Sequence, residues 1–121
     1  MNTDFAMVNS TLVSLFPSAT RTSSINGTGV DVSEFDGMAA VILDSGAGVG
    51  TMDITLQDSA DNVTFVNIPG VKFDQVTTTA VQKKININIA VVKKFLRAAI
   101  VLASAPQFTF SVNLLAVKQY T

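Results

Sequence analysis

The sequence predicts an all-β fold, namely an antiparallel β-sandwich or jelly roll of about seven or eight strands with an N-terminal arm. Segments in which apolar and polar residues alternate recur roughly every 10–15 residues, as expected for half-buried strands. Turn-forming residues separate these segments, and the connections are too short for the helical crossovers that parallel strands need. No convincing helical pattern follows Pro17.

The clearest strand signal lies in residues 51–69. Met52, Ile54 and Leu56 are apolar and alternate with polar residues, so one face of this strand is expected to be buried. Short polar residues at 58–62 favour a tight turn because their side chains can bond to nearby backbone. Residues 63–68 are again β-favouring, so the whole stretch predicts a β-hairpin.

The segments before this hairpin predict further strands. Asn26-Gly27 is the strongest two-residue turn signal in the chain and predicts a strand, a turn and a second strand within residues 21–32. The continuous apolar run at 38–43 is typical of a strand buried on both faces. The glycine-rich residues 44–50 then predict a flexible loop that leads into the hairpin.

The segments after the hairpin predict three more strands. Residues 71–79 suggest an irregular connection or a weak strand, and residues 81–89 alternate clearly, with Lys83 interrupting the apolar face as at a protected sheet edge. Ala105-Pro106 marks a turn between the last two strands. The inward-facing residues of these two strands are expected to be Leu96, Ala98, Ile100 and Leu102, and then Phe108, Phe110, Val112 and Leu114.

The chain is expected to form one sandwich domain at residues 21–121, preceded by an arm or docking segment at residues 1–20. Apolar residues of the first segment fall at helical spacing, but poor helix formers lie between them and Pro17 closes the segment. A short helix, an extended arm and a first strand of the domain therefore all remain open. The candidate interaction residues are Phe5, Val8, Leu12, Leu15 and Phe16 of this segment, together with Lys93 and Lys94.

Composition argues against catalysis. The chain contains no Cys and no His, which removes disulfides, thiolate metal sites and the serine and cysteine triads. We therefore expect no enzymatic activity, no cofactor and no metal. Charged residues make up only 14% of the chain, against about a quarter in an average protein. Such a surface suits a protein that packs against copies of itself or other partners.

The charge distribution is lopsided. Residues 1–74 hold all nine acidic residues and only two basic ones, for a net charge of −7, whereas residues 75–121 hold six basic residues and no acid, for +6. Either basic and acidic strands pair within one sheet, or complementary faces guide subunit docking. We expect no nucleic-acid binding because the net charge is −1 and only Phe95 accompanies the basic residues. The longest apolar runs are too short to span a bilayer, so no membrane association is expected.

Three short motifs invite a chemical interpretation. The glycines at 46–50 are followed by a strand, whereas a nucleotide-binding loop needs a helix there. The acidic residues at 58–62 could ligate Ca²⁺, but turn formation explains them better. Asp31, Glu34 and Asp36 could form a pair of catalytic carboxylates, but a solvated turn is the better interpretation.

Three segments resemble a known family. Residues 29–37 read GVDVSEFDG, residues 56–65 read LQDSADNVTF and residues 95–97 read FLR. Together they are similar to small virion proteins of tailed bacteriophages, over about residues 21–117. Tyr is commoner than Phe at position 95 in that group, and the apolar N-terminal segment matches no motif of it.

The resemblance implies a β-sandwich or jelly-roll subunit of a phage particle. It would be a capsid decoration or cement protein at the capsid surface, binding the major capsid protein or other virion subunits as a homo-oligomer. One alternative is a head–tail connector or tail structural protein of the same particle. Another is a carbohydrate-binding sandwich, which would need exposed aromatic residues such as Tyr120 or Phe35.

Overall fold

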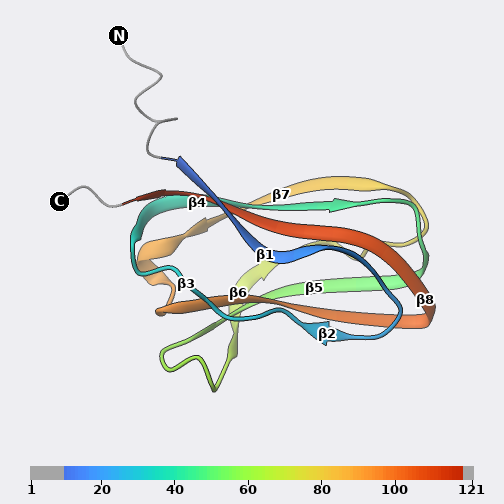
Figure 1. Cartoon of the computed structure of the whole chain (residues 1–121), viewed down its shortest axis with the longest axis horizontal. Helices are drawn as coiled ribbons and strands as arrows, with labels where there is room; N and C mark the ends of the chain where they lie inside the picture. The colour runs from blue at the N-terminus through green and yellow to red at the C-terminus, as the bar shows by residue number, and fades with distance from the viewer. Residues whose placement is uncertain (1–9, 119–121) are drawn as a thin grey trace, which may run out of the picture.

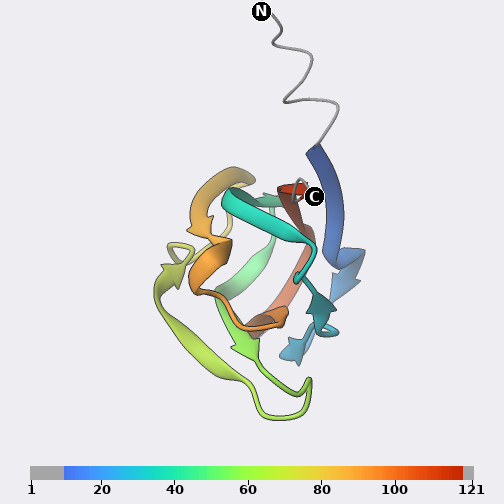
Figure 2. The same ribbon diagram turned by 90° about the vertical axis from the view of Figure 1, so that its left-hand side faces the viewer.

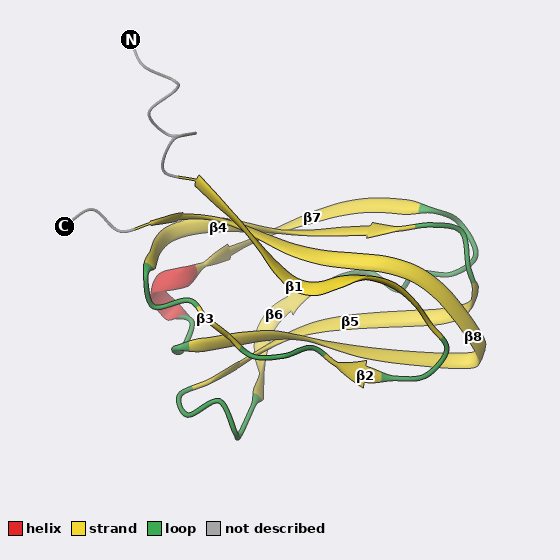
Figure 3. Ribbon diagram, in the orientation of Figure 1, coloured by secondary structure: helices red, strands yellow, loops and turns green. Residues whose placement is uncertain are grey.

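The computed structural model describes residues 10–118 as two β-sheets packed around one apolar core (Figures 1 and 3). A single 3-10 turn, η1 (Ile89–Val91), interrupts the strands of this part of the chain. The predicted antiparallel sandwich is confirmed. Its strands are β1 (Ser10–Arg21), β2 (Ile25–Asn26), β3 (Val30–Asp31), β4 (Phe35–Ser45), β5 (Val49–Ser59), β6 (Val66–Lys72), β7 (Val81–Asn88) and β8 (Phe95–Lys118).

Strand β8 belongs to both sheets. Residues 108–118 pair with β1 on one side and β4 on the other, and β4 also pairs with β7, giving the order β1-β8-β4-β7. We call this sheet A. Residues 95–103 pair with β5 on one side and with β2 and β3 on the other, and β5 pairs with β6. We call this sheet B, and Figure 2 shows the two layers from one end.

The bend in β8 corrects the predicted turn at Ala105-Pro106. Ser104 and Ala105 have φ angles of 67° and 52°, so the strand reverses its direction without ending. It therefore passes from sheet B to sheet A at the right-hand end of the molecule in Figure 1. A local signal for a turn does not distinguish a hairpin from such a bend.

The predicted loop within residues 44–50 is confined to residues 46–48, between β4 and β5, and it packs against β8. The Gly46 N–H donates to the Thr109 carbonyl oxygen at 3.0 Å, so this segment follows the bend of β8. Gly50 has φ of +87°, and a Cβ there would lie 2.4 Å from the Ala103 carbonyl oxygen. Only glycine fits at such a position.

The inward-facing residues lie where the alternation predicts. Met52, Ile54 and Leu56 of β5 are all buried, as are all eight inward-facing residues expected in the two halves of β8. The rings of Phe16 and Phe110 stack with their centroids 5.1 Å apart. Strands of both sheets thus contribute to a single core.

Residues 10–20, predicted as part of an arm, form most of strand β1. This strand pairs antiparallel with β8 from Ser10↔Val117 to Arg21↔Phe108, so it crosses the expected boundary at residue 20. A register shift between Ser14 and Phe16 turns both Leu15 and Phe16 inward, where they are buried. The first-strand alternative is therefore right for this part, and residues 1–9 lie outside the described chain.

The Asn26-Gly27 pair does not form the predicted hairpin turn. Strands β2 and β3 both pair with β8, at Ile100–Ala99 and at Leu96–Phe95, so the segment runs on along one edge of sheet B. The Gly27 N–H donates to the Ala98 carbonyl oxygen at 2.7 Å. A Cβ at Gly27 would lie 2.8 Å from the Leu15 carbonyl oxygen, so the glycine permits close approach of backbones.

The apolar run at 38–43 is buried on one face only, which corrects the prediction for β4. Ala39, Val41 and Leu43 point into the core, whereas Met38 is 62% exposed and Ile42 is partly exposed. A run of this kind usually has cover on both sides. Among the described residues, nothing forms a second layer over this outer face.

Residues 51–89 form the elements that the sequence predicts. β5 and β6 form the predicted hairpin, although β6 begins only at Val66. The connection after β6 is irregular, with an isolated bridge between Met52 and Val76. β7 lies at the edge of sheet A, and the ammonium of Lys83 lies 3.9 Å from a carboxylate oxygen of Asp74.

Candidate functional site

The outer surface of sheet A exposes a group of apolar side chains. Leu12 lies opposite Leu115 in the β1–β8 pairing, and Leu115 lies opposite Ala40 in the β4–β8 pairing, so the three form one row across three strands. Leu12 is 64% exposed and Leu115 is 40% exposed. We define the apolar face as Leu12, Met38, Ala40, Ile42, Leu115 and Val117.

Part of the outer surface of sheet B is polar, and its polar side chains bond to one another. Gln57 Nε2 donates to Asn67 Oδ1 at 2.9 Å, and Arg97 Nε donates to Gln57 Oε1 at 2.8 Å. The Arg97 guanidinium also lies 4.0 Å from the ring centroid of Phe65. We define the polar face by these four residues, which together link β5, β6 and β8 and need no partner from another molecule.

Polar residues border the apolar face at both ends. Asp36 lies opposite Val117 at one end, and Lys84 lies opposite Ile42 toward the other. Beyond Ile42, a hollow of about 330 Å³ is lined by Asp44, Gln82 and the two lysines of β7. The apolar face therefore has charges of both signs at its rim.

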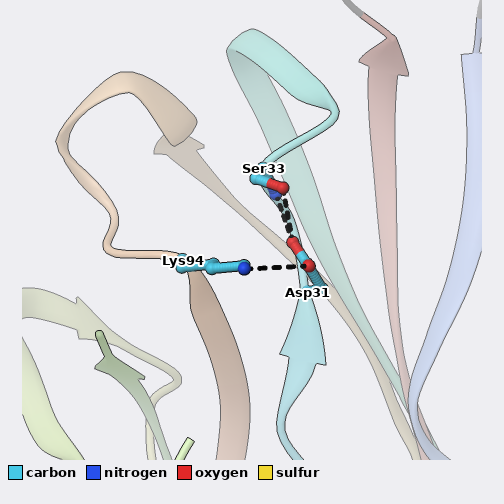
Figure 4. A network of polar contacts seen from close by, with 3 residues as sticks. All are labelled: Asp31, Ser33 and Lys94. Atoms are coloured by element: carbon cyan, nitrogen blue, oxygen red, sulfur yellow. Dashed lines mark hydrogen bonds and ion pairs between the residues drawn. The ribbon is translucent and has the colours of Figure 1, made fainter. Parts of the chain in front are cut away.

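The acidic corner is a structural turn. Ser33 donates to Asp31 Oδ1 through both its hydroxyl, at 2.6 Å, and its backbone N–H, at 2.9 Å (Figure 4). The Lys94 ammonium lies 4.0 Å from the other oxygen of the same carboxylate. Hydrogen bonds from Ser33, with a smaller contribution from Lys94, lower the pKa of Asp31 below its usual value. Asp31 thus holds the chain between β3 and β4.

The turn at 58–62 is likewise held by its own carboxylate. Asp61 Oδ1 accepts hydrogen bonds from the N–H groups of Thr64 and Val63, at 3.0 and 2.9 Å, and from the Ser59 hydroxyl at 2.8 Å. These bonds lower the pKa of Asp61 to about 2. All three donors bond to Oδ1, so this carboxylate holds the turn, which supports the turn over the Ca²⁺ interpretation. Among residues 10–118, no three His, Cys, Asp or Glu residues gather as a metal site.

The structure divides the seven candidate interaction residues. Leu12 belongs to the apolar face, whereas Leu15 and Phe16 are core residues and are not available to a partner. Lys93 and Lys94 are exposed between η1 and β8, where the Lys93 N–H donates to Asp58 Oδ2 at 3.1 Å. Phe5 and Val8 lie outside the described residues.

Sequence reasoning missed Met38, Leu115 and Val117. A signal for them was present, since residues 38–43 and 114–117 are apolar at successive positions where a half-buried strand alternates. The run at 38–43 was interpreted as a strand buried within the chain, and the run at 114–117 was not recognised. Phe35, one of the two aromatic residues required by the carbohydrate-binding alternative, is buried in the core, and Tyr120 lies outside the described residues.

Arg21 lies beside the core on the other side of β1. Its guanidinium is 4.9 Å from the ring centroid of Phe16, and its Nε is buried without a hydrogen-bond partner in the described chain. The ring face supplies a favourable contact for the cation. No helix in residues 10–118 has the length and apolar character needed to cross a membrane.

No protein-family model matches the chain, and no curated protein matches its sequence. Solved structures share its fold. A crystal structure of the SPBc2 prophage-derived protein YomS is 14% identical with a TM-score of 0.57, over 90% of this chain and 93% of that one. The PBSX exported protein XepA is 14% identical with a TM-score of 0.64, over 92% of this chain, which spans only 38% of XepA.

A third similar structure comes from Bacillus endospore appendages, described as disulfide-linked pili. It is 12% identical with a TM-score of 0.53, over 92% of this chain and 88% of that one. At these identities the likeness shows the fold alone. This chain contains no Cys, so it cannot form disulfide links of its own.

Proposed function

We propose that this chain is a structural subunit of a bacteriophage particle. Within the particle, it is a capsid decoration or cement protein that binds and stabilises neighbouring major capsid subunits at the capsid surface. The observation that carries the proposal is the apolar face, because a sandwich that exposes apolar side chains on three adjacent strands has the surface of a subunit in an assembly.

Two further findings support a phage setting. The fold is shared over nearly the full length of both chains with a prophage-derived protein. The segments at 29–37, 56–65 and 95–97 resemble small virion proteins of tailed phages, and in the structure the first two form turns that their own side chains hold together. They therefore specify the scaffold rather than a reaction.

The proposal includes no enzymatic role. Asp31, which belongs to the candidate catalytic carboxylates, and Asp61, which belongs to the candidate Ca²⁺ ligands, accept hydrogen bonds from their own turns. Lys93 and Lys94 stay candidates for contacts with the shell, because both are exposed at one end of the sandwich. Contacts with other subunits would be non-covalent.

The test uses phage particles from which the gene for this chain has been deleted. We expect them to assemble but to lose their DNA at a lower temperature than wild-type particles, and we expect purified protein to co-sediment with them and restore their heat resistance. Absence of the chain from purified wild-type particles would overturn the proposal. Failure of the added protein to bind the depleted particles would overturn the cement role.

Copy number and truncation refine the assignment. Hundreds of copies per particle would support shell decoration, whereas a single ring's worth would place the chain in the connector or tail. Removal of residues 1–9 tests the proposed arm, because it leaves β1 intact. The arm is supported if this truncation weakens particle binding, and contradicted if binding is unchanged.

A further inference from the structure

The apolar face is continuous across the centre of sheet A. Ala40 and Leu115 lie on β4 and β8, the two central strands of the sheet, and Leu12 extends the row to β1. Single exposed apolar residues are common on protein surfaces, but neighbouring ones on adjacent strands are characteristic of interaction sites. The polar face of sheet B shows that the same fold can satisfy an outer surface internally.

Each of the two central strands contains a run of apolar residues typical of a strand that is covered on both sides. Residues 38–43 of β4 read MAAVIL and residues 114–117 of β8 read LLAV, without the polar alternation found in β5. Within each run, every second residue enters the core and the others point outward. The outward residues therefore have the chemistry of an interior without a second layer in the described chain.

We propose that the apolar face binds a second copy of this chain, face to face about a two-fold axis that crosses the strands at the Ala40–Leu115 row. This inference names one partner of the proposed virion subunit and rests on that function only for its biological setting. A two-fold contact uses the same surface on both copies, so the surface must be self-complementary.

The shape of the apolar face is self-complementary. Met38 protrudes on one side of the Ala40 row and is 62% exposed. The hollow beside Ile42, Asp44 and Gln82 lies on the other side of the same row, between the same two strands, β4 and β7. The proposed rotation reverses the direction of the strands, so Met38 of each copy is placed over the hollow of the other.

The charges at the rim of the apolar face are also self-complementary. Asp36 lies beside Met38, opposite Val117, and Lys84 lies beside the hollow, opposite Ile42. The same rotation brings Lys84 of one copy to the Asp36 end of the other. Because the axis is two-fold, the dimer contains this contact twice. Opposite charges at the rim of an apolar contact fix its register and orientation. A net charge of only −1 adds little repulsion between copies.

The size of the face predicts a weak dimer. Three strands spaced by about 4.8 Å, over about seven residues of β4, give a surface of roughly 14 by 24 Å. This is on the order of 350 Å² per copy in plan, which is small for a specific interface. We therefore expect a micromolar dissociation constant for the free protein, and stronger pairing where copies are held together in a particle.

The experiment is sedimentation velocity of the full chain over concentrations from about 0.5 to about 500 μM, which bracket a micromolar dissociation constant. We expect the mass to rise from monomer to dimer. Leu115→Lys should raise the dissociation constant about tenfold or more, because it places a charge at the centre of the contact. Val101→Lys is the matched control on sheet B, since Val101 lies on the same strand and is 55% exposed.

A charge exchange tests the arrangement itself. Lys84→Glu and Asp36→Lys should each weaken the dimer severalfold, and the double variant should recover most of the loss because the pairs are restored with reversed sign. Circular dichroism confirms that each variant is folded. If Leu115→Lys does not fold, Leu115→Ser provides the milder test.

Several outcomes would overturn the inference. These are a chain that stays monomeric throughout the range, a dimer weakened equally by Val101→Lys, and a double variant no better than the two single ones. A monomer that dimerises only after removal of residues 1–9 would mean that the chain's own N-terminal segment covers the face. If free protein stays monomeric but Leu115→Lys abolishes particle binding, the partner is another virion subunit, and the proposed function stands without this inference.

Discussion

The outer faces of sheets A and B differ although β8 runs through both. On sheet B, Gln57, Asn67 and Arg97 bond to one another across three strands. On sheet A, part of the outer surface holds exposed apolar residues such as Leu12 and Leu115, and the polar residues Asn86 and Asn113 lie beside them. Two surfaces with the same backbone pattern thus face different surroundings: the polar face suits water, and the apolar face suits contact with another protein.

The uneven distribution of charge along the chain is only partly used within the molecule. Two ion pairs join the acidic first part of the chain to the basic second part, Lys83 with Asp74 at 3.9 Å and Lys94 with Asp31 at 4.0 Å. Both pairs are long and exposed, so each contributes little to folding. Pairing within the molecule therefore explains only part of the asymmetry, and Asp36 and Lys84 at the rim of the apolar face provide a further use for it.

The largest predicted effect separates the two sides of sheet A. Leu114 is fully buried and its neighbour Leu115 points outward. Leu114→Ala should lower the free energy of unfolding by about 2–5 kcal/mol, because it leaves a cavity in the core. Leu115→Ala should lower it by less than about 1 kcal/mol. Urea denaturation of dilute protein measures both, and similar losses would mean that the apolar face serves folding rather than association.

The alternation of apolar and polar residues predicted which side of each strand faces the core. The periodic residues of β5 and of both halves of β8 are buried as expected, because burial on one side of a strand is a local property of the sequence. Pairing partners are not local. The turn predicted at Ala105-Pro106 is a bend within β8, and Asn26-Gly27 lies on an extended segment at the edge of sheet B. The conformation of both segments depends on pairing with strands that are distant in the sequence.

The candidate site was harder to foresee than the core. Apolar runs at 38–43 and 114–117 indicate cover on both faces, but a sequence does not state whether the second cover comes from the same chain. Leu15 and Phe16 appeared to belong to an arm because the register shift that turns both inward leaves no mark in the residue pattern. The surface exists only because β1, β4 and β8 lie side by side in the fold.

The second prediction concerns the corner that joins the two sheets. Gly50 and Gly70 both have positive φ, but a Cβ would meet the Ala103 carbonyl oxygen at 2.4 Å in Gly50 and nothing within 4 Å in Gly70. Gly70→Ala should cost about 1–2 kcal/mol from backbone strain alone. Gly50→Ala should cost more, about 3 kcal/mol or above, because the backbone of β8 must also move. Equal losses in thermal unfolding would show that the corner can relax.

The third prediction tests the bonds of the polar face. Arg97→Ala removes the hydrogen bond to Gln57 and the contact with the Phe65 ring, and should lower the free energy of unfolding by about 1–2 kcal/mol. Arg97→Lys should lose about half as much, because an ammonium keeps the charge but not the planar geometry. Sedimentation should show unchanged self-association for both. A change there would mean that sheet B also contributes to the interface.

The smallest predicted effect concerns the turn between β5 and β6, at the sheet B side of the molecule. Hydrogen bonds from Thr64, Val63 and Ser59 lower the pKa of Asp61 from 3.8 to about 2. Because the folded pKa lies below the unfolded one, the contribution of Asp61 to stability is complete above pH 3.8 and is lost as the pH falls toward 2. The destabilisation caused by Asp61→Asn should therefore be constant from pH 7 to pH 5 and shrink below that interval.

Urea denaturation at several pH values measures this difference, and Asp74→Asn serves as the control for the change in net charge because the Asp74 side chain is exposed. Self-association should not respond to Asp61→Asn at any pH, because the turn lies at the end of the β5–β6 hairpin and outside sheet A. An effect of Asp61→Asn on the dimer at neutral pH would break the division between a self-sufficient sheet B and an associating sheet A. A destabilisation that stays the same down to pH 2 would show that the turn holds without its charge.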